Sequence, residues 1–384
     1  MRPTVLSALC ATTLLAACSG DHPHIGEPSV SSPVETTVVE PPVLLEIHPG
    51  EPISPERCAA NQAAGTITYL SGFDFAAASS IVDPVFAEAQ GYYEAMCLDV
   101  QLRSGSSTEN YAVVADNQAQ FASGGSFSEV AEFASGNGAD LVAMSVEGRT
   151  AIDTLIITDP SITTLADIEG KKLGVKFALP RSISAMLASQ GLVEGENFET
   201  VLLDGFDPTV HAAVPGIVGF PGWKSNEPGQ LDAAGISYTL IDPADFDVPG
   251  SFGVIYSNQQ FLSEHPTAGQ DFMRATMMAL ADAIADPAAA AEACIAKITE
   301  NGNPFYLSPE GETARWSVES RLIRQSASDP LPLGVPDRQR LELEIATYAR
   351  AGLFDGIAPL LDSLFESPMV AELYDGGTLV WPSE

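Results

Sequence analysis

The sequence predicts an α/β protein of two lobes joined at a hinge, with mainly parallel sheets and a cleft between the lobes. Short apolar strands alternate with amphipathic helices along most of the chain. About 325 residues follow a polar N-terminal segment, more than a single hydrophobic core usually organises. Two strand-like segments, 153–158 and 252–256, separate one α/β series from the next. The chain is therefore expected to leave the first lobe, build a second and return.

The first α/β series is expected to form lobe 1. Its segments are a strand at 65–70, a helix at 80–94, a strand at 98–102, a helix at 109–118, a strand at 120–122, a helix after 126 and a strand at 140–146. Strands and helices in this alternation favour a mainly parallel sheet with right-handed crossovers.

The second series is expected to form lobe 2. It has strands at 172–176, 199–203 and 216–220, and helices from 182, at 208–214 and near 226. After the return at 252–256 the pattern is helical and punctuated by prolines. The predicted organisation is a signal peptide (1–17), a tether (18–57), lobe 1 (58–152 and 253–384) and lobe 2 (153–252).

The N-terminus has the pattern of an export signal. Arg2 precedes a short apolar stretch at 5–15, which is too short for a permanent membrane span. Leu15-Ala16-Ala17-Cys18 has small residues before a cysteine and resembles the lipobox of bacterial lipoproteins. That resemblance implies cleavage before Cys18, a lipid on its sulfur and anchorage at the extracytoplasmic face of the cell membrane. The following Pro-, Ser- and Thr-rich segment lacks an apolar period and is expected to be a flexible tether.

The net charge limits the classes of molecule that the protein is expected to bind. The chain has 17 Lys and Arg against 51 Asp and Glu, a net charge of −34, which argues against nucleic acid as a partner and mildly favours a neutral or cationic ligand.

Cys58 and Cys97 precede the first two strands, so neighbouring strands would bring them into a disulfide, leaving Cys294 as a buried free thiol on an Ala-rich helix. The spacings fit no zinc motif, and no metal or other cofactor is expected.

Candidate ligand-binding residues follow the carboxyl ends of the strands, where ligands bind in doubly wound sheets. They are Phe73, Asp74, Phe75, Gly124, Gly125, Ser126, Arg181, Ser182, Trp223, Asn226 and Glu227. Aromatic rings can stack on a flat ligand, and a carboxylate can accept N–H bonds from an amino-substituted ring. The set therefore suits a flat, nitrogen-rich ring.

Each candidate also has a structural alternative. Phe73 and Phe75 would serve equally as core residues, and the two glycines as a tight turn. Ser126 and Ser182 are possible N-caps, and Glu227 would favour a helix N-terminus through the dipole. Arg181 with Ser182 could instead bind an anion at a helix start.

Three segments resemble a known family. They are 75–102 (with GYYEAMCLDVQL), 165–175 (LADIEGKKLGV) and 258–285 (NQQFLSEHPTAGQDFMRATMMALADAIA), and they resemble type II periplasmic binding proteins. The segment 222–228 (GWKSNEP) is similar to the "NE" segment of the group that binds the pyrimidine precursor of thiamine.

The resemblance implies a lipid-anchored, monomeric solute-binding protein that closes on a small molecule near 152–154 and 252–254 and delivers it to an ABC transporter permease. An aminopyrimidine thiamine precursor is the expected ligand, and a sulfonate or aromatic acid is the alternative within the same fold. A relative of the pyrimidine synthases would be an enzyme, but their Cys-rich motif is absent from this sequence. We therefore expect no catalytic residues.

Overall fold

The computed structural model describes residues 46–301, 308–326, 331–364 and 367–383. The predicted signal peptide, the predicted lipidation site Cys18 and the tether as far as residue 45 lie outside the described residues. The first helix, α1 (Pro55–Gln62), begins within the range predicted as tether.

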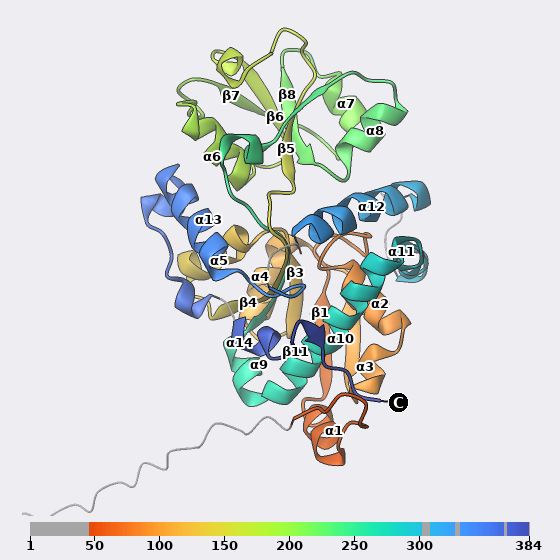
Figure 1. The fold of residues 1–384 in the computed structure, drawn as a ribbon. Helices are drawn as coiled ribbons and strands as arrows, with labels where there is room; N and C mark the ends of the chain where they lie inside the picture. The colour runs from red at the N-terminus through yellow and green to blue at the C-terminus, as the bar shows by residue number, and fades with distance from the viewer. Residues whose placement is uncertain (1–45, 302–307, 327–330, 365–366, 384) are drawn as a thin grey trace, which may run out of the picture. The chain divides into compact units, whose positions relative to one another are not determined.

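The first sheet has the strand order β2-β1-β3-β10-β4. Its strands are Thr66–Leu70 (β1), Asp99–Arg103 (β2), Phe121–Gly124 (β3), Leu141–Gly148 (β4) and Phe252–Asn258 (β10). β1 pairs in parallel with β2 and β3, whereas β10 is antiparallel to both β3 and β4. We call this sheet and the helices that pack on it lobe 1 (Figure 1).

The second sheet has the order β7-β6-β8-β5-β9. Its strands are Asp153–Ile157 (β5), Lys172–Val175 (β6), Glu199–Leu202 (β7), Gly219–Trp223 (β8) and Thr239–Ile241 (β9). β6 pairs in parallel with β7 and β8, whereas β5 is antiparallel to β8 and β9. Each sheet is therefore mixed, because the strand that enters it after a crossover runs against its neighbours. This sheet and its helices form lobe 2.

The helices follow the predicted alternation with local differences. In lobe 1 they are α2 (Val82–Ala89), α3 (Tyr92–Ala95), α4 (Ser107–Ala115), α5 (Phe127–Asn137), α9 (Gln259–Glu264), α10 (Pro266–Ala285), α11 (Pro287–Asn301), α12 (Pro309–Ser326), α13 (Arg338–Arg350) and α14 (Ser367–Ala371). In lobe 2 they are α6 (Arg181–Ser189), α7 (Pro208–Ala212) and α8 (Glu227–Ala233). The single helix expected at 80–94 is split into α2 and α3, because Gly91 adopts a left-handed conformation between them (φ 73°).

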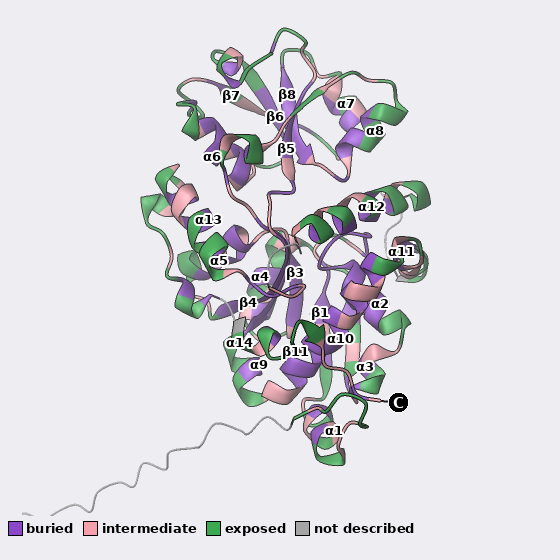
Figure 2. Cartoon of the chain, viewed as in Figure 1, coloured by how far each residue is buried: buried purple, intermediate pink, exposed green. Residues whose placement is uncertain are grey.

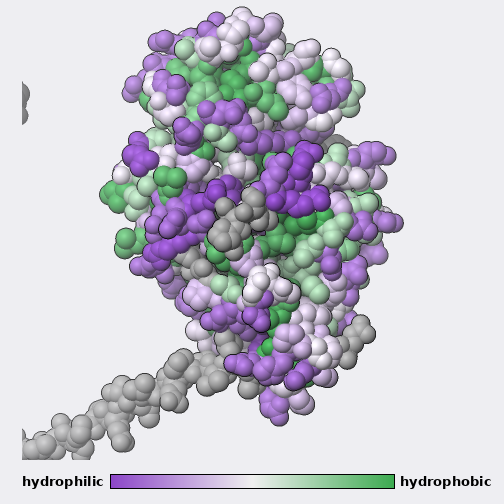
Figure 3. Space-filling view, viewed as in Figure 1, coloured by the Kyte–Doolittle hydropathy of each residue, from purple (hydrophilic) through white to green (hydrophobic). Residues whose placement is uncertain are grey.

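Strand alternation places a hydrophobic core on each face of the first sheet. Ile67 and Tyr69 of β1 point into one core, and Leu70 of the same strand points into the other. Lobe 2 has its own buried clusters, and the buried residues concentrate on the sheets (Figure 2). In the view of Figure 3, hydrophobic side chains gather over the second sheet within a largely hydrophilic surface. Among the described residues, no helix is both long and apolar enough to cross a membrane.

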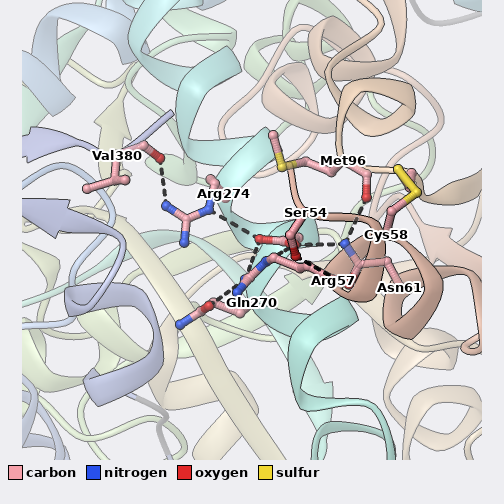
Figure 4. A network of polar contacts seen from close by, with 10 residues as sticks. Ser54, Arg57, Cys58, Asn61, Met96, Gln270, Arg274 and Val380 are labelled. Atoms are coloured by element: carbon pink, nitrogen blue, oxygen red, sulfur yellow. Dashed lines mark hydrogen bonds and ion pairs between the residues drawn. A yellow bond between two sulfur atoms is a disulfide. The ribbon is translucent and has the colours of Figure 1, made fainter. Parts of the chain in front are cut away.

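Helix α1 is fixed to lobe 1 by a disulfide and by a buried polar network (Figure 4). The structure contains the predicted Cys58–Cys97 disulfide, and Cys294 is a buried free thiol in α11. The Arg57 guanidinium donates to both oxygens of Asp271 on α10, each at 2.7 Å. Asn61 and Arg274 donate to the same carboxylate, at 2.7 and 3.2 Å.

Candidate functional site

The ends of the strands bring aromatic rings together from both lobes. Phe73 follows β1 and is 40% exposed, and its ring centroid lies 6.0 Å from that of Phe206, which follows β7. Lys176, directly after β6, places its Nζ 5.6 Å from the centroid of the Phe206 ring. Phe177 and Leu202, at the ends of β6 and β7, are 79% and 74% exposed. Exposed apolar side chains therefore lie at the ends of β6 and β7, the strands that precede Lys176 and Phe206.

Two half-buried carboxyl groups lie close enough to influence each other, and Lys176 is near enough to Asp153 to affect its pKa. Glu129 lies in the first turn of α5 in lobe 1, and Asp153 is the first residue of β5 in lobe 2. The hydroxyl of Tyr111 donates to Glu129 Oε2 at 3.5 Å, and Ser182 Oγ donates to Asp153 Oδ2 at 2.8 Å. Both carboxyls retain more acceptor capacity than these single contacts use.

Burial changes the acidity of these two groups. Burial, and then the nearby Asp153 carboxyl, raise the pKa of Glu129 to about 7, although Arg181 partly opposes this. Burial also raises the pKa of Asp153 to about 6, against the hydrogen bond from Ser182. Two acids that titrate near neutrality can donate as well as accept hydrogen bonds there.

The cation predicted for an anion site is already paired. Arg181 opens α6 and forms an ion pair with Glu132 of α5, across the two lobes (Nε to Oε2, 2.7 Å). Ser182 is buried and donates to Asp153. An anion bound at the N-terminus of α6 would therefore lie near the carboxyl groups of Glu132 and Asp153 as well as near Arg181.

The segment that resembles the "NE" motif is held by the protein itself. Glu227 is 2% exposed, and its two oxygens accept from Lys176 Nζ and from the backbone N–H of Trp223, each at 2.7 Å. Asn226 Oδ1 accepts from Arg315 of α12 at 2.9 Å. Trp223 is half-buried and packs against the lobe 1 core. Trp223, Lys224 and Asn226 are the half-buried residues of this segment, and Trp223 is the aromatic one among them.

The other predicted site residues have structural roles that their positions explain. Phe75 is 1% exposed and lies in the lobe 1 core, whereas Asp74 adopts a left-handed conformation (φ 48°) in the loop. Gly124 ends β3, and a Cβ on Gly125 would lie 2.8 Å from Glu129 Oε2. Ser126 is the N-cap of α5, where its Oγ accepts from the Glu129 N–H at 3.4 Å.

Sequence reasoning missed Glu129, Asp153, Lys176 and Phe206. Lys176 and Phe206 follow the ends of β6 and β7, so the rule that selected Phe73 also applies to them. Strand β8 was expected at 216–220 but spans Gly219–Trp223, which pairs Trp223 with Asp153. Asp153 therefore lies directly across from Trp223 in the neighbouring strand.

The described residues include a shallow pocket away from these groups. Its volume is about 360 Å³, and it lies where α4 and α5 end, lined in part by Asp116, Phe133 and Gly138. It contains none of the predicted ligand-binding residues. No cluster of three or more metal-ligating side chains occurs among the residues that the structure describes.

Comparisons with known proteins relate the chain to binding proteins. A family model described as NMT1/THI5 like matches residues 80–290. The riboflavin-binding protein RibY of Chloroflexus aurantiacus is 23% identical over 186 residues, which are 48% of this chain and 49% of RibY. The chain therefore spans about half the length of this curated relative.

Solved structures share the fold at low identity. A putative sulfonate ABC transporter protein, the periplasmic sulfonate-binding protein SsuA of Methylobacillus flagellatus, superimposes with a TM-score of 0.57 at 15% identity, covering 80% of this chain and 93% of that one. A Candida albicans protein with the generic periplasmic binding protein fold gives a TM-score of 0.52 at 17% identity, covering 83% and 97%.

The family match extends over more than half of the chain, since residues 80–290 are 211 of 384. The two lobes, their mixed sheets and the two crossovers agree with the fold of the solved structures. The chain belongs to the NMT1/THI5-like family and has the periplasmic binding protein fold.

Proposed function

We propose that the protein is an extracytoplasmic solute-binding protein of an ABC importer, and that it binds a flat, nitrogen-containing ring between its lobes. The observation that carries this proposal is the combination of the Phe73–Phe206 ring pair with the carboxyls Glu129 and Asp153. The rings come from opposite lobes, so a planar ligand can contact both. The carboxyls supply hydrogen bonds at its polar edge.

An aminopyrimidine precursor of thiamine is the preferred ligand. The ring nitrogen and the exocyclic amine of an aminopyrimidine form an acceptor–donor edge, which matches a carboxylic acid in two parallel hydrogen bonds. Glu129, with a pKa of about 7, can present this acid form at neutral pH. In the sequence-based prediction Glu227 had this role, but its oxygens are engaged by Lys176 and Trp223.

A sulfonate or aromatic acid is the second candidate, because a sulfonate-binding protein shares the fold. The charge distribution disfavours it. Arg181 is paired with Glu132, and Lys176 is paired with Glu227 at 2.7 Å. An incoming anion would have to displace one of these carboxylates while lying near Glu129 and Asp153.

Two further parts of the proposal concern location and partners. A lipid on Cys18 would hold a monomeric binding protein at the outer face of the membrane, where a permease could receive its ligand. Metabolic labelling with a fatty acid tests this part. Labelling is expected in the full chain and absent in Cys18→Ser, and equal labelling of both would contradict the lipid anchor.

The ligand is tested by thermal-shift titration of residues 46–384 with hydroxymethyl-aminopyrimidine, riboflavin and a set of alkanesulfonates. A ligand at 100 times its dissociation constant adds about 2.7 kcal/mol to the free energy of unfolding. We expect the aminopyrimidine to raise the melting temperature, and Phe206→Ala and Glu129→Gln each to reduce that rise. The control is Leu240→Ala, because Leu240 is also exposed on lobe 2 (42%) but lies in β9.

The outcomes separate the candidates. A shift with riboflavin alone would keep the ring-binding site but replace the ligand. A shift with sulfonates alone, abolished in Arg181→Met, would contradict the nitrogen-ring proposal. Turnover of the aminopyrimidine by the protein would contradict a binding role and indicate an enzyme.

A further inference from the structure

Helix α12 places three buried charged side chains toward lobe 2. They are Glu312, Arg315 and Glu319, which are 1%, 7% and 0% exposed. Spacings of three and four residues align them on one face of the helix. The helix belongs to lobe 1, since Trp316 and Ile323 on it lie in the lobe 1 core, and the Trp316 indole N–H donates to Ala283 O at 2.9 Å.

The two carboxylates of this face accept backbone N–H groups from the loop that precedes α2. Ala77 N–H donates to Glu312 Oε2 and Ser79 N–H donates to Glu319 Oε2, each at 2.6 Å. Arg315 lies between the carboxylates and donates to Glu312 at 2.6 Å. These bonds anchor the charged face to lobe 1.

The same side chains also reach lobe 2. Glu319 Oε1 accepts from Ser225 Oγ at 2.7 Å, and Arg315 Nη2 donates to Asn226 Oδ1 at 2.9 Å. A single buried carboxylate is therefore shared between Ser79 of one lobe and Ser225 of the other. Hydrogen bonds to a charged group are stronger than neutral ones, and their strength grows when they are buried.

We propose that Glu319 and Arg315 are positioning residues of the ligand site, which hold the lobe 2 segment from Trp223 to Glu227 in a fixed orientation against lobe 1. We call Glu312, Arg315 and Glu319 the strap. The strap binds Ser225 and Asn226, which lie between Trp223 and Glu227, and so it also fixes the positions of Trp223 and Glu227. Trp223 in turn pairs with Asp153. Loss of a strap contact at Ser225 should therefore displace Trp223, which lies two residues earlier in the chain, and with it Asp153 of the ligand site.

The clearest variant is Ser225→Ala, because it removes only the lobe 2 end of the bridge and leaves the Ser79–Glu319 bond of lobe 1. The interlobe distance is measured between spin labels at Gln118→Cys and Glu196→Cys, which are exposed on lobes 1 and 2. The labels are placed in residues 46–384, where the native cysteines are either disulfide-bonded (Cys58 and Cys97) or buried (Cys294). In the ligand-free protein, Ser225→Ala is expected to broaden the distance distribution.

Ligand affinity provides the second measurement and rests on the proposed function. Losing a buried hydrogen bond to a carboxylate should weaken binding about tenfold. Glu319→Gln is the conservative variant, because its carboxamide can accept from Ser79 N–H and donate to Ser225 Oγ, so it should behave as wild type. Ser189→Ala is the control, since Ser189 Oγ in lobe 2 donates to Met186 O of α6 and accepts from the neighbouring Gln190 side chain, and neither contact reaches lobe 1.

The ligand-free distances test the strap whether or not the ligand is correctly assigned. A broadened distribution in Ser225→Ala, unchanged in Ser189→Ala and Glu319→Gln, supports the strap. A distribution in Ser225→Ala identical to wild type would overturn it. A defect in Glu319→Gln together with a normal Ser225→Ala would also overturn it, by limiting Glu319 to a role within lobe 1.

Discussion

Two buried polar networks in this protein differ in how their charges are balanced. At α1, the Asp271 carboxylate receives Arg57, Asn61 and Arg274, and Arg57 and Asp271 are 1% and 0% exposed. At the interlobe site, Glu129 and Asp153 are half-buried acids that each accept from one side-chain hydroxyl. The network around the saturated Asp271 carboxylate belongs to a structural anchor. The unsaturated one has hydrogen-bonding capacity that a ligand can use.

The physical reason for the difference is the cost of burying charge. A buried ion is tolerated when opposite charge and hydrogen bonds replace its water, as at Asp271. Where these are missing, the acid instead holds its proton more tightly, as the raised pKa of Glu129 indicates. The comparison indicates that a carboxyl group with too few hydrogen-bond donors marks a binding site when a ligand can reach it. The following predictions test this idea.

The largest expected effect is in the saturated network. Arg57→Met should lower the free energy of unfolding by about 3 kcal/mol, because Asp271 would lose its main counter-charge while staying buried. Urea unfolding measures this change. The matched control is Lys172→Met, since Lys172 and Glu199 form an ion pair with both side chains more than half exposed, and its expected cost is below about 1 kcal/mol. Equal effects would contradict the importance of burial.

A second pair of acids can break the comparison. Asp83 and Glu147 are 0% and 3% exposed in lobe 1, and their carboxyl groups lie close enough to affect each other's pKa, facing Tyr69 and Glu319. These two carboxyl groups have too few hydrogen-bond donors, but they are too deeply buried for a ligand to reach them. Burial is the main cause that raises the pKa of Asp83 to about 8, and it raises that of Glu147 as well.

The sign of the pH effect at Asp83 follows from proton uptake. The folded protein holds this proton up to about pH 8, whereas the unfolded chain releases it near pH 4, so stability falls as the pH rises between these values. Asp83→Asn should remove part of this fall and be more stable than wild type at pH 9, by about 1.4 kcal/mol or more. Melting temperatures from pH 5 to pH 9 test it. A wild-type stability independent of pH would contradict the raised pKa of Asp83.

A smaller effect concerns ligand binding at Glu129. If the bound ring and this carboxyl share one proton, binding should weaken above pH 7, because the free Glu129 carboxyl loses its proton there. The dissociation constant should rise by up to about tenfold per pH unit. Calorimetric titration of the aminopyrimidine from pH 6 to pH 9 measures the slope. In Glu129→Gln the slope should disappear, and an unchanged slope would assign the proton to another group.

Local sequence patterns predicted the fold but not all partners at the site. Alternation gave both series of strands and helices, because each element has its own periodicity. The end of β8 was misplaced, because the predicted strand stopped at Phe220, whereas β8 continues through Pro221 to Trp223. Strand β8 pairs with β6 only at Gly219. Pro221 therefore removes no hydrogen bond from the edge of β8 that faces β6. The Arg57–Asp271 contact joins residues 214 apart, which no local pattern reveals.

The smallest predicted effect separates two roles of Ser126. Its Oγ caps α5 by accepting the N–H of Glu129, and Ala at an N-cap costs about 1 kcal/mol. If Ser126 is only a cap, Ser126→Ala should lower stability by this amount and leave ligand affinity nearly unchanged. If the hydroxyl also binds the ligand, affinity should fall while Ser126→Thr restores it, because threonine retains both the cap and the hydroxyl. Unfolding curves and ligand titrations of the two variants decide whether this N-terminus belongs to the anchor or to the site.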